Sequence, residues 1–202
     1  MYRLNVRVLA FCLAVLGMAV PVLAQSVPKA ELSAGYQFLN FVVDGENESM
    51  AKGWYFDVAG NLTPTFGLVF QIGGNYKTFE ESVALGGITS TASADLKVHE
   101  FLGGVRLNSH AGATIVPFGQ VLVGGMSGSV DVSSTTTIPG QAPISFNQSD
   151  SGTNFALQTG GGVNFGLTDG VGLRVGADYL RIFEDGGGAN LFRFHVGLVF
   201  GR

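Results

Sequence analysis

The chain has 202 residues, of which 46% are hydrophobic, 13% are charged and 31 are glycine, and its formal net charge is −4. The charged fraction is about half the usual ~25% while the apolar fraction is ordinary, which excludes intrinsic disorder, and a glycine excess without a Gly-X-Y repeat excludes collagen. The acidic balance lacks the basic surface that nucleic-acid binding requires, so we expect no nucleic-acid partner.

The first 24 residues have the pattern of a secretory signal peptide. Arg3 and Arg7 precede an uncharged apolar run over residues 8–20, and Val22-Leu23-Ala24 places small residues at the −3 and −1 positions of a cleavage site. The run is too short to cross ~30 Å of hydrocarbon as a helix, which disfavours the alternative of a retained membrane anchor. We therefore expect a signal peptide at 1–24 and a mature domain at 25–202, whose net charge is −6 after the loss of the two arginines.

The mature domain is expected to lack thiol chemistry and membrane-spanning helices. The one cysteine, Cys12, lies in the signal peptide, so disulfides, thiol catalysis and cysteine metal sites are excluded. No later stretch reaches 18 consecutive apolar residues, so no transmembrane helix is predicted.

Eight segments of the mature domain alternate apolar with small or polar residues, which is the period of a β-strand. These segments begin near residues 31, 54, 66, 95, 114, 154, 171 and 191. Their length of about 10–13 residues matches the ~9–11 residues of a membrane-spanning strand better than the ~5–6 residues of an average soluble strand. Trp54, Tyr76 and Tyr179 fall near strand ends, where interfacial aromatic residues are expected.

Two of the eight segments are irregular. In residues 95–107, Leu96 and Val98 are out of phase with Phe101, and we expect a β-bulge near His99-Glu100 to reconcile them. In residues 114–126 both sets of alternate positions are apolar, so the facing of this strand stays open, and Pro117 indicates a bulge or a strand end.

The predicted connections are long and short in turn, as in an outer-membrane barrel. They cover residues 42–52, 63–64, 78–94, 108–113, 127–153, 168–170 and 184–189. The segment 127–153 contains eleven Ser or Thr residues, and we expect it to be a polar surface loop. Eight strands return both termini to the side of the short turns, which is the periplasm.

These patterns predict an all-β fold, a closed eight-stranded antiparallel up-and-down transmembrane β-barrel. A sheet survives in hydrocarbon only by closing on itself, with its apolar face outward and side chains filling the lumen. The inward charged set is expected to be Glu31, Asp57, Arg106, Arg174, Asp178, Arg193 and His195. Three acids and three arginines nearly balance, and Asp178 and Arg193 lie on adjacent strands. We expect a structural network that fills the lumen, with a gated ion path as the alternative.

Four features of the sequence carry a resemblance: the opening Ala30–Tyr36 strand, the segment 60–64, Phe101–Arg106 before Val116–Gly119, and an alternating terminal strand that ends in phenylalanine. In these features the chain is similar to the small outer-membrane β-barrel family, which includes OmpA-type membrane domains and OmpX. The resemblance implies an outer-membrane location and contact with membrane lipid and lipopolysaccharide. The terminal strand resembles the signal read by the barrel-insertion machinery, here carried by Phe194, Val196, Leu198 and Phe200.

Signals for chemistry are weak. His99, His110 and His195 lack metal-ligand spacing, and we expect no catalytic residue, metal or cofactor. Asp44, Glu46 and Glu48 lack a full calcium loop, and a solvated acidic loop is favoured over a site that binds Ca²⁺ or bridges lipopolysaccharide.

The expected function is therefore non-enzymatic: a role in envelope integrity, or in surface interaction through extracellular loops whose partner the sequence does not identify. A narrow channel for ions or small solutes is the second reading. A secreted lipocalin-like ligand binder is the third, disfavoured because lipocalins place their apolar face inward.

Overall fold

The computed structural model describes residues 29–43, 46–109, 114–184 and 187–201. The expected signal peptide at 1–24, as well as His110 and Asp44, lies outside these residues. Among the described residues there is no helix with the length and apolar character needed to cross a membrane.

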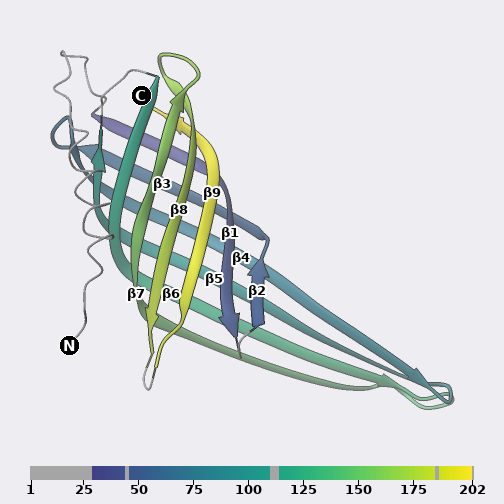
Figure 1. Cartoon of the computed structure of the whole chain (residues 1–202). Coiled ribbons are helices and arrows are strands. Elements are labelled where there is room, and N and C mark those ends of the chain that lie inside the picture. The colour runs from purple at the N-terminus through teal and green to yellow at the C-terminus, as the bar shows by residue number, and fades with distance from the viewer. Residues whose placement is uncertain (1–28, 44–45, 110–113, 185–186, 202) are drawn as a thin grey trace.

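Eight antiparallel strands close into a barrel, which confirms the predicted fold class, and a ninth short strand lies beside them (Figure 1). The strands are β1 (Ala30–Val43), β2 (Glu46–Met50), β3 (Lys52–Asn61), β4 (Phe66–Leu85), β5 (Ile88–Asn108), β6 (Ile115–Thr137), β7 (Ile144–Gly166), β8 (Val171–Phe183) and β9 (Asn190–Phe200). Barrel strands pair with their neighbours in chain order, and β1 pairs with β9 to close the sheet, with Leu32 opposite Phe200.

Strand β2 occupies part of the predicted 42–52 loop. It pairs with the second half of β1, with Leu39 opposite Met50, while β3 pairs with the first half, with Tyr36 opposite Trp54. Ala51 separates the two strands, so together they form one interrupted wall strand beside β1.

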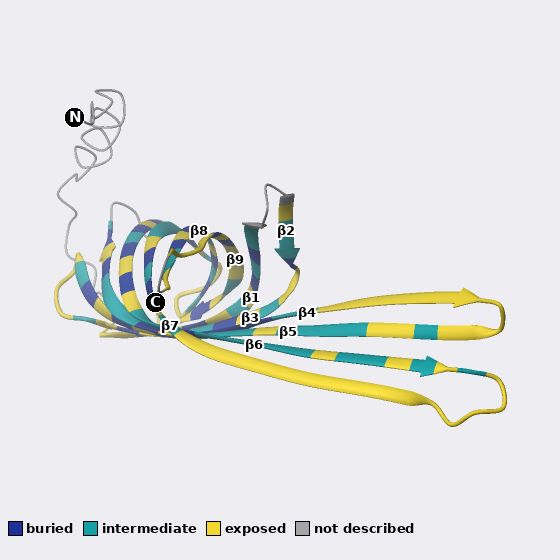
Figure 2. Ribbon diagram, turned by 90° about the horizontal axis from the view of Figure 1, so that it is seen from below, coloured by how far each residue is buried: buried dark blue, intermediate teal, exposed yellow. Residues whose placement is uncertain are grey.

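The two faces of the wall follow the sequence alternation. On β9, Phe194 is 53% exposed on the outer surface, whereas its neighbour Arg193 is 1% exposed inside. Figure 2 shows the same alternation of buried and exposed residues around the barrel. The outer surface is therefore apolar, as hydrocarbon requires, and the charged side chains lie in the lumen.

The predicted bulge near His99-Glu100 is wrong. Strand β5 pairs without interruption with both β4 and β6, and Glu100 stands opposite Gly73 on one side and Met126 on the other. Leu102 is fully buried inside the barrel. The alternation of apolar and polar residues changes phase along this strand because some apolar side chains face the lumen, and the backbone itself is regular.

The facing of residues 114–126 has the same explanation. Phe118 and Leu122 are buried in the lumen, while Val121 and Val123 are exposed on the outer surface. Both faces of β6 are apolar because an apolar layer fills part of the barrel interior. Pro117 lies near the start of the strand, as expected of a residue that cannot donate a ladder hydrogen bond.

The predicted loops at 78–94 and 127–153 are also wrong. Strands β4 to β7 continue through both segments and stay paired with each other to their tips. The pairing with β3 ends at Tyr76 and the pairing with β8 begins at Phe155, so four strands run on alone. We call residues 77–97 and 129–151 the sheet extension. It projects sideways beyond the outline of the barrel (Figures 1 and 2).

Both tips of the sheet extension have the turn residues that a tight reversal needs. Gly86 and Gly87 join β4 to β5 with φ angles of 58° and 82°, the left-handed conformation of a type I′ hairpin turn. At the other tip, Pro139 precedes Gly140, whose φ is 78°, and Gln141 N donates to Ile138 O at 3.1 Å. This is the arrangement of a type II turn.

The short turns lie at the opposite end of the barrel from the sheet extension (Figure 1). Thr63 Oγ1 accepts a hydrogen bond from Phe66 N at 3.0 Å, and Thr168 Oγ1 accepts one from Val171 N at 3.2 Å. The predicted turns at 63–64 and 168–170 are therefore confirmed, and the barrel has one short-turn end and one extended end.

Candidate functional site in the lumen

The lumen contains a polar network with an apolar cluster toward the sheet extension. On several strands an inward polar residue is followed, two positions nearer the sheet extension, by an inward apolar residue. Leu39 follows Gln37 in this way, and Leu180 follows Asp178. The buried apolar cluster consists of Leu39, Met50, Ala59, Val69, Leu102, Leu122, Met126, Ala156, Leu180 and Leu191. Most of these side chains lie toward the sheet extension. Ala59 and Val69 lie on the short-turn side of Asp57 and Gln71, and Leu102 lies between Arg106 and Glu100, so the cluster is interleaved with the polar network.

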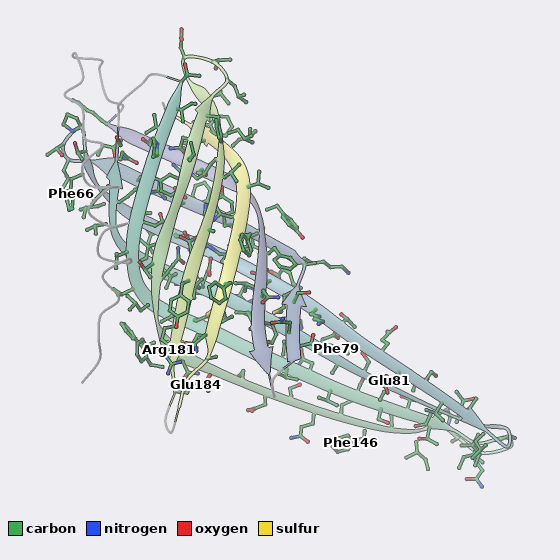
Figure 3. The ribbon with its side chains drawn as sticks, in the orientation of Figure 1. Phe66, Phe79, Glu81, Phe146, Arg181 and Glu184 are labelled. Atoms are coloured by element: carbon green, nitrogen blue, oxygen red, sulfur yellow. The ribbon has the colours of Figure 1, made fainter. Side chains whose placement is uncertain are left out.

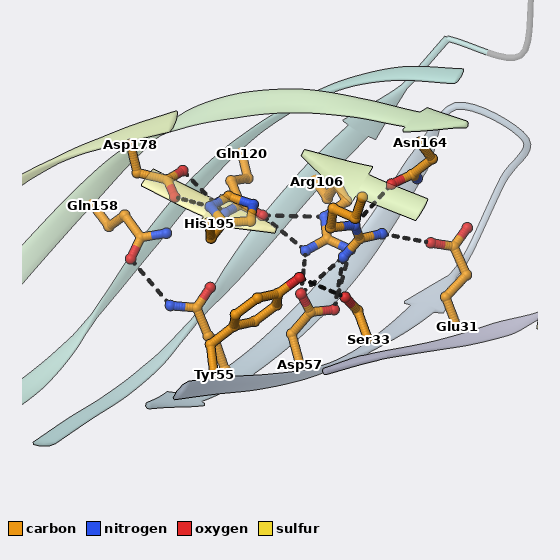
Figure 4. Close-up of polar contacts among 12 residues, drawn as sticks. Glu31, Ser33, Tyr55, Asp57, Arg106, Gln120, Gln158, Asn164, Asp178 and His195 are labelled. Carbon is orange, nitrogen blue, oxygen red and sulfur yellow. Dashed lines mark hydrogen bonds and ion pairs between the residues drawn. The ribbon is translucent and has the colours of Figure 1, made fainter. Parts of the chain in front are cut away.

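Asp57 holds two arginines in the first part of the network (Figure 4). Its Oδ2 lies 3.1 Å from Arg106 Nη2 and 2.8 Å from Arg174 Nη1. Arg174 Nη2 also lies 3.2 Å from Glu31 Oε2, and the Phe118 ring lies within 5.0 Å of both guanidinium carbons. The aromatic face and the shared carboxylate thus stabilise two like charges side by side.

Arg193 is the centre of the second part. Its Nε donates to Asp178 at 3.0 Å, and its Nη1 donates to Glu100 at 2.8 Å and to Gln37 at 3.2 Å. Its Nη2 donates to Gln71 at 3.0 Å and also to Asp178. All five N–H groups of this guanidinium therefore have an acceptor.

The two parts are joined across the barrel. Gln120 accepts from Arg106 Nη2 at 2.9 Å and donates its Nε2 to Asp178 Oδ1 at 3.2 Å. His195 Nδ1 lies 3.2 Å from Asp178 Oδ2, and the His195 ring packs edge-on against Tyr55 with centroids 5.1 Å apart. The result is one continuous set of buried hydrogen bonds rather than separate pairs.

Two wall glycines provide the space that this network occupies. A Cβ added at Gly176 would lie 2.4 Å from the His195 Cε1 atom, and one added at Gly160 would lie 2.3 Å from Asp178 Oδ1. No larger residue fits at either position without displacing the network.

The structure places all seven sequence-predicted charged residues inside the barrel, each at most 5% exposed. The Asp178–Arg193 pair expected from the register is present. Sequence reasoning missed Glu100, at the position of the predicted bulge, and Gln120, on the strand whose facing the sequence leaves open. Uninterrupted alternation from Arg106 back along β5 would have found Glu100. The described lumen thus holds four carboxylates, three guanidiniums and one imidazole.

The arrangement suits stability better than chemistry. Each of the four lumen carboxylates lies beside an arginine, and the apolar cluster shares the interior with the network. Across the described ranges, no group of three or more His, Cys, Asp or Glu side chains could hold a metal ion. Glu48, from the predicted acidic loop, forms an ion pair with Lys77.

The four residues of the predicted insertion signal lie together on the outer face of β9. Phe194, Val196, Leu198 and Phe200 are 42–53% exposed and point toward the membrane side of the wall. Their recognition by the insertion machinery stays a prediction.

The chain resembles known outer-membrane proteins in both sequence and fold. The outer membrane protein β-barrel domain family matches over residues 10–200. A search of curated proteins finds no match. Among solved structures, Ail, the attachment invasion locus protein of Yersinia pestis, has a TM-score of 0.55 at 18% identity, covering 87% of this chain and 100% of Ail. Neisserial surface protein A has a TM-score of 0.53 at 9% identity, covering 88% of this chain and 100% of that protein.

At these identities the structural neighbours support the fold alone. The family match extends over nearly the whole chain, and the closed barrel agrees with it. The chain is therefore a transmembrane barrel of the outer membrane and belongs to the outer membrane protein β-barrel domain family.

Proposed function

We propose that the chain is a non-enzymatic outer-membrane anchor that displays its sheet extension outside the cell for contact with a partner. The sheet extension is the observation that carries this proposal: β4 runs from Lys77 to Leu85 beyond its last pair with β3, and β5 to β7 accompany it. A long paired sheet outside the bilayer contributes nothing to spanning it, so a role in contact accounts for it best.

The filled lumen supports anchoring over transport. A channel needs an open polar path, whereas buried ion pairs and buried apolar side chains together fill the described interior. The polar layer likewise disfavours an apolar ligand inside the barrel, the lipocalin-like reading. The network then serves to stabilise the barrel.

The outer surface supports contact with lipid headgroups at the base of the sheet extension. Trp54 Nε1 donates to Tyr76 Oη at 3.2 Å, and the Tyr76 hydroxyl lies 3.2 Å from His99 Nε2. Lys52 and Lys97 flank Tyr76 in the cross-strand register. Aromatic and basic side chains at one level are typical of a membrane boundary, and Lys52 is positioned to meet lipopolysaccharide phosphate.

The charges of the sheet extension favour a neutral or cationic partner. It carries five carboxylates and two lysines. Lys77 pairs with Glu48, and Lys97 Nζ lies 2.8 Å from Asp131 Oδ2, a hydrogen bond that holds the pKa of Asp131 below its usual value. Ail has been crystallised with the heparin analogue sucrose octasulfate, but the sheet extension of this chain does not suit such a polyanion.

Cysteine labelling in intact cells tests the display of the sheet extension. Because the mature chain has no cysteine, Ser82→Cys gives a single thiol on the sheet extension, and Asp169→Cys gives one in a short turn. We expect a membrane-impermeant maleimide to label Ser82→Cys in intact cells and Asp169→Cys only after the outer membrane is permeabilised. Labelling of Asp169→Cys but not Ser82→Cys in intact cells would place the sheet extension in the periplasm and contradict the proposal.

A further inference from the structure

The sheet extension has two chemically different faces. Its outer face continues the lipid side of the barrel and consists mainly of Ser and Thr residues, and we call it the hydroxyl face. One cross-strand row of this face contains Ser82, Thr91, Thr135 and Ser145. Its other face continues the lumen side of the wall and carries Phe79, Val83, Leu85, Val132, Ile144 and Phe146. We call this second surface the apolar face. Figure 3 labels Phe79, Glu81 and Phe146 along the strands of the sheet extension.

The apolar face is open. Leu85 is 81% exposed, Val83 is 66% exposed and Phe146 is 58% exposed. The sheet extension projects beyond the barrel outline, so the chain's own barrel does not cover it (Figure 2). Contiguous apolar surface of this kind on a folded protein marks a site of contact.

We propose that the apolar face packs against the same face of a second copy of this chain in the same outer membrane. This inference goes beyond the proposed function, because it concerns contact between two copies and not contact with a foreign partner. Four strands about 4.8 Å apart and some nine residues long at 3.3 Å per residue give a face of roughly 550 Å². When two such faces cross, about 19 Å by 19 Å of each is covered, so the pair buries roughly 700 Å², the size of a weak, reversible interface.

The distribution of charge on the apolar face supports a stacked pair. Within the sheet extension, the residues of β5 and β6 on the apolar face are uncharged, and Ala92 and Ala94 leave room for close approach. Its charged residues, Lys77, Glu81 and Asp150, lie on the edge strands β4 and β7. A small and apolar centre with a charged rim is the anatomy of a protein interface, and the rim charges disfavour burial in lipid hydrocarbon.

The membrane permits this pairing. The sheet extension projects to one side of its barrel (Figures 1 and 2). A two-fold axis parallel to the barrel axis, through the apolar face, would therefore place the two barrels on opposite sides of the stacked sheets. Both barrels then cross the same bilayer in the same direction, and the contact is closed and self-complementary. The crossed strands form a two-layer sheet of the orthogonal kind.

Crosslinking of a matched pair of variants tests the proposal. Ser134 lies on the apolar face near its centre and Ser133 on the hydroxyl face, so Ser134→Cys and Ser133→Cys differ only in the face that carries the thiol. Stacked sheets lie about 10 Å apart, beyond the reach of a disulfide, so a short bismaleimide is the suitable reagent. The reaction is carried out on outer membranes that contain the full chain.

We expect Ser134→Cys to give a crosslinked dimer. For Ser133→Cys, the yield of crosslinked dimer should stay at the level that random collision produces. Adding Val132→Asp to Ser134→Cys should reduce the dimer about tenfold or more, because it buries an unpaired carboxylate in the interface. The control adds Ser129→Asp, on the hydroxyl face, to Ser134→Cys, and it should leave the yield of crosslinked dimer unchanged. Heat-modified gel mobility checks that each variant is a folded barrel.

Three outcomes would overturn the proposal. Equal crosslinking of the two cysteine variants would mean that no face is preferred. A dimer that survives Val132→Asp would lie elsewhere on the molecule. A monomer whose Ser134→Cys thiol crosslinks to a different protein would assign the apolar face to a foreign partner.

Discussion

Replacing Arg193 with alanine should lower the free energy of unfolding by about 3–5 kcal/mol, the usual loss when one partner of a buried ion pair is removed. Arg193 donates to Asp178, Glu100, Gln37 and Gln71, so the substitution leaves two buried carboxylates without their cation. Urea unfolding of barrels refolded into lipid vesicles measures the change. The fluorescence of Trp54, the one tryptophan, reports the transition.

Two further variants distinguish this electrostatic cause from a general loss of packing. Arg181→Ala removes a half-exposed arginine that donates to Asn190 at 2.6 Å, and we expect it to cost no more than about 1 kcal/mol. Adding Glu100→Gln to Arg193→Ala should recover part of the loss, because one of the stranded charges is then neutral. An unchanged unfolding midpoint for Arg193→Ala, with an altered single-channel current, would contradict the structural role of the network.

Gly176→Ala should destabilise the barrel by about 1–3 kcal/mol, the usual effect of added volume in a packed interior. The new Cβ would lie 2.4 Å from His195 Cε1 and 2.8 Å from the carbonyl oxygen of Gly161. The imidazole or the wall would have to shift, which would disturb the contact between His195 and Asp178. The same urea titration measures this effect.

Gly152→Ala is the matched control for this substitution. Gly152 lies at the base of the sheet extension, where an added Cβ meets nothing within 4 Å, so we expect a change within about 0.5 kcal/mol. Combining Gly176→Ala with His195→Ala should shrink the penalty of Gly176→Ala, since the overlapping ring is gone. An equal loss for Gly176→Ala and Gly152→Ala would mean that the space beside His195 does not account for the glycine at position 176.

The barrel and most of its lumen charges could be predicted because each outer position must be apolar in hydrocarbon. That rule gives strong alternation on β9, where Phe194 and Arg193 point in opposite directions, and the register then brings Arg193 opposite Asp178. The rule constrains only the outer face. Leu102 and Leu122 show that the inner face can also be apolar, which is why Glu100 was missed.

The sheet extension could not be recognised from composition, because Ser- and Thr-rich segments are typical of loops. Paired Thr and Ser residues nevertheless suit an exposed sheet face, as in the Ser82–Thr91 hydrogen bond of 2.9 Å. The local signals were the Gly86-Gly87 and Pro139-Gly140 pairs, both typical of turns that reverse a strand. Val130 and Val132 also alternate with polar neighbours within the segment 127–153.

Conductance across a planar lipid bilayer tests most directly whether the barrel is an anchor with a closed lumen. Purified barrels are inserted into the bilayer, with a large-pore porin as the positive control for insertion. The ion network around Arg193 and the apolar cluster that includes Leu39 and Leu180 predict a baseline without discrete steps. Reproducible, ion-selective current steps from the unmodified chain would contradict the account and make the lumen a channel.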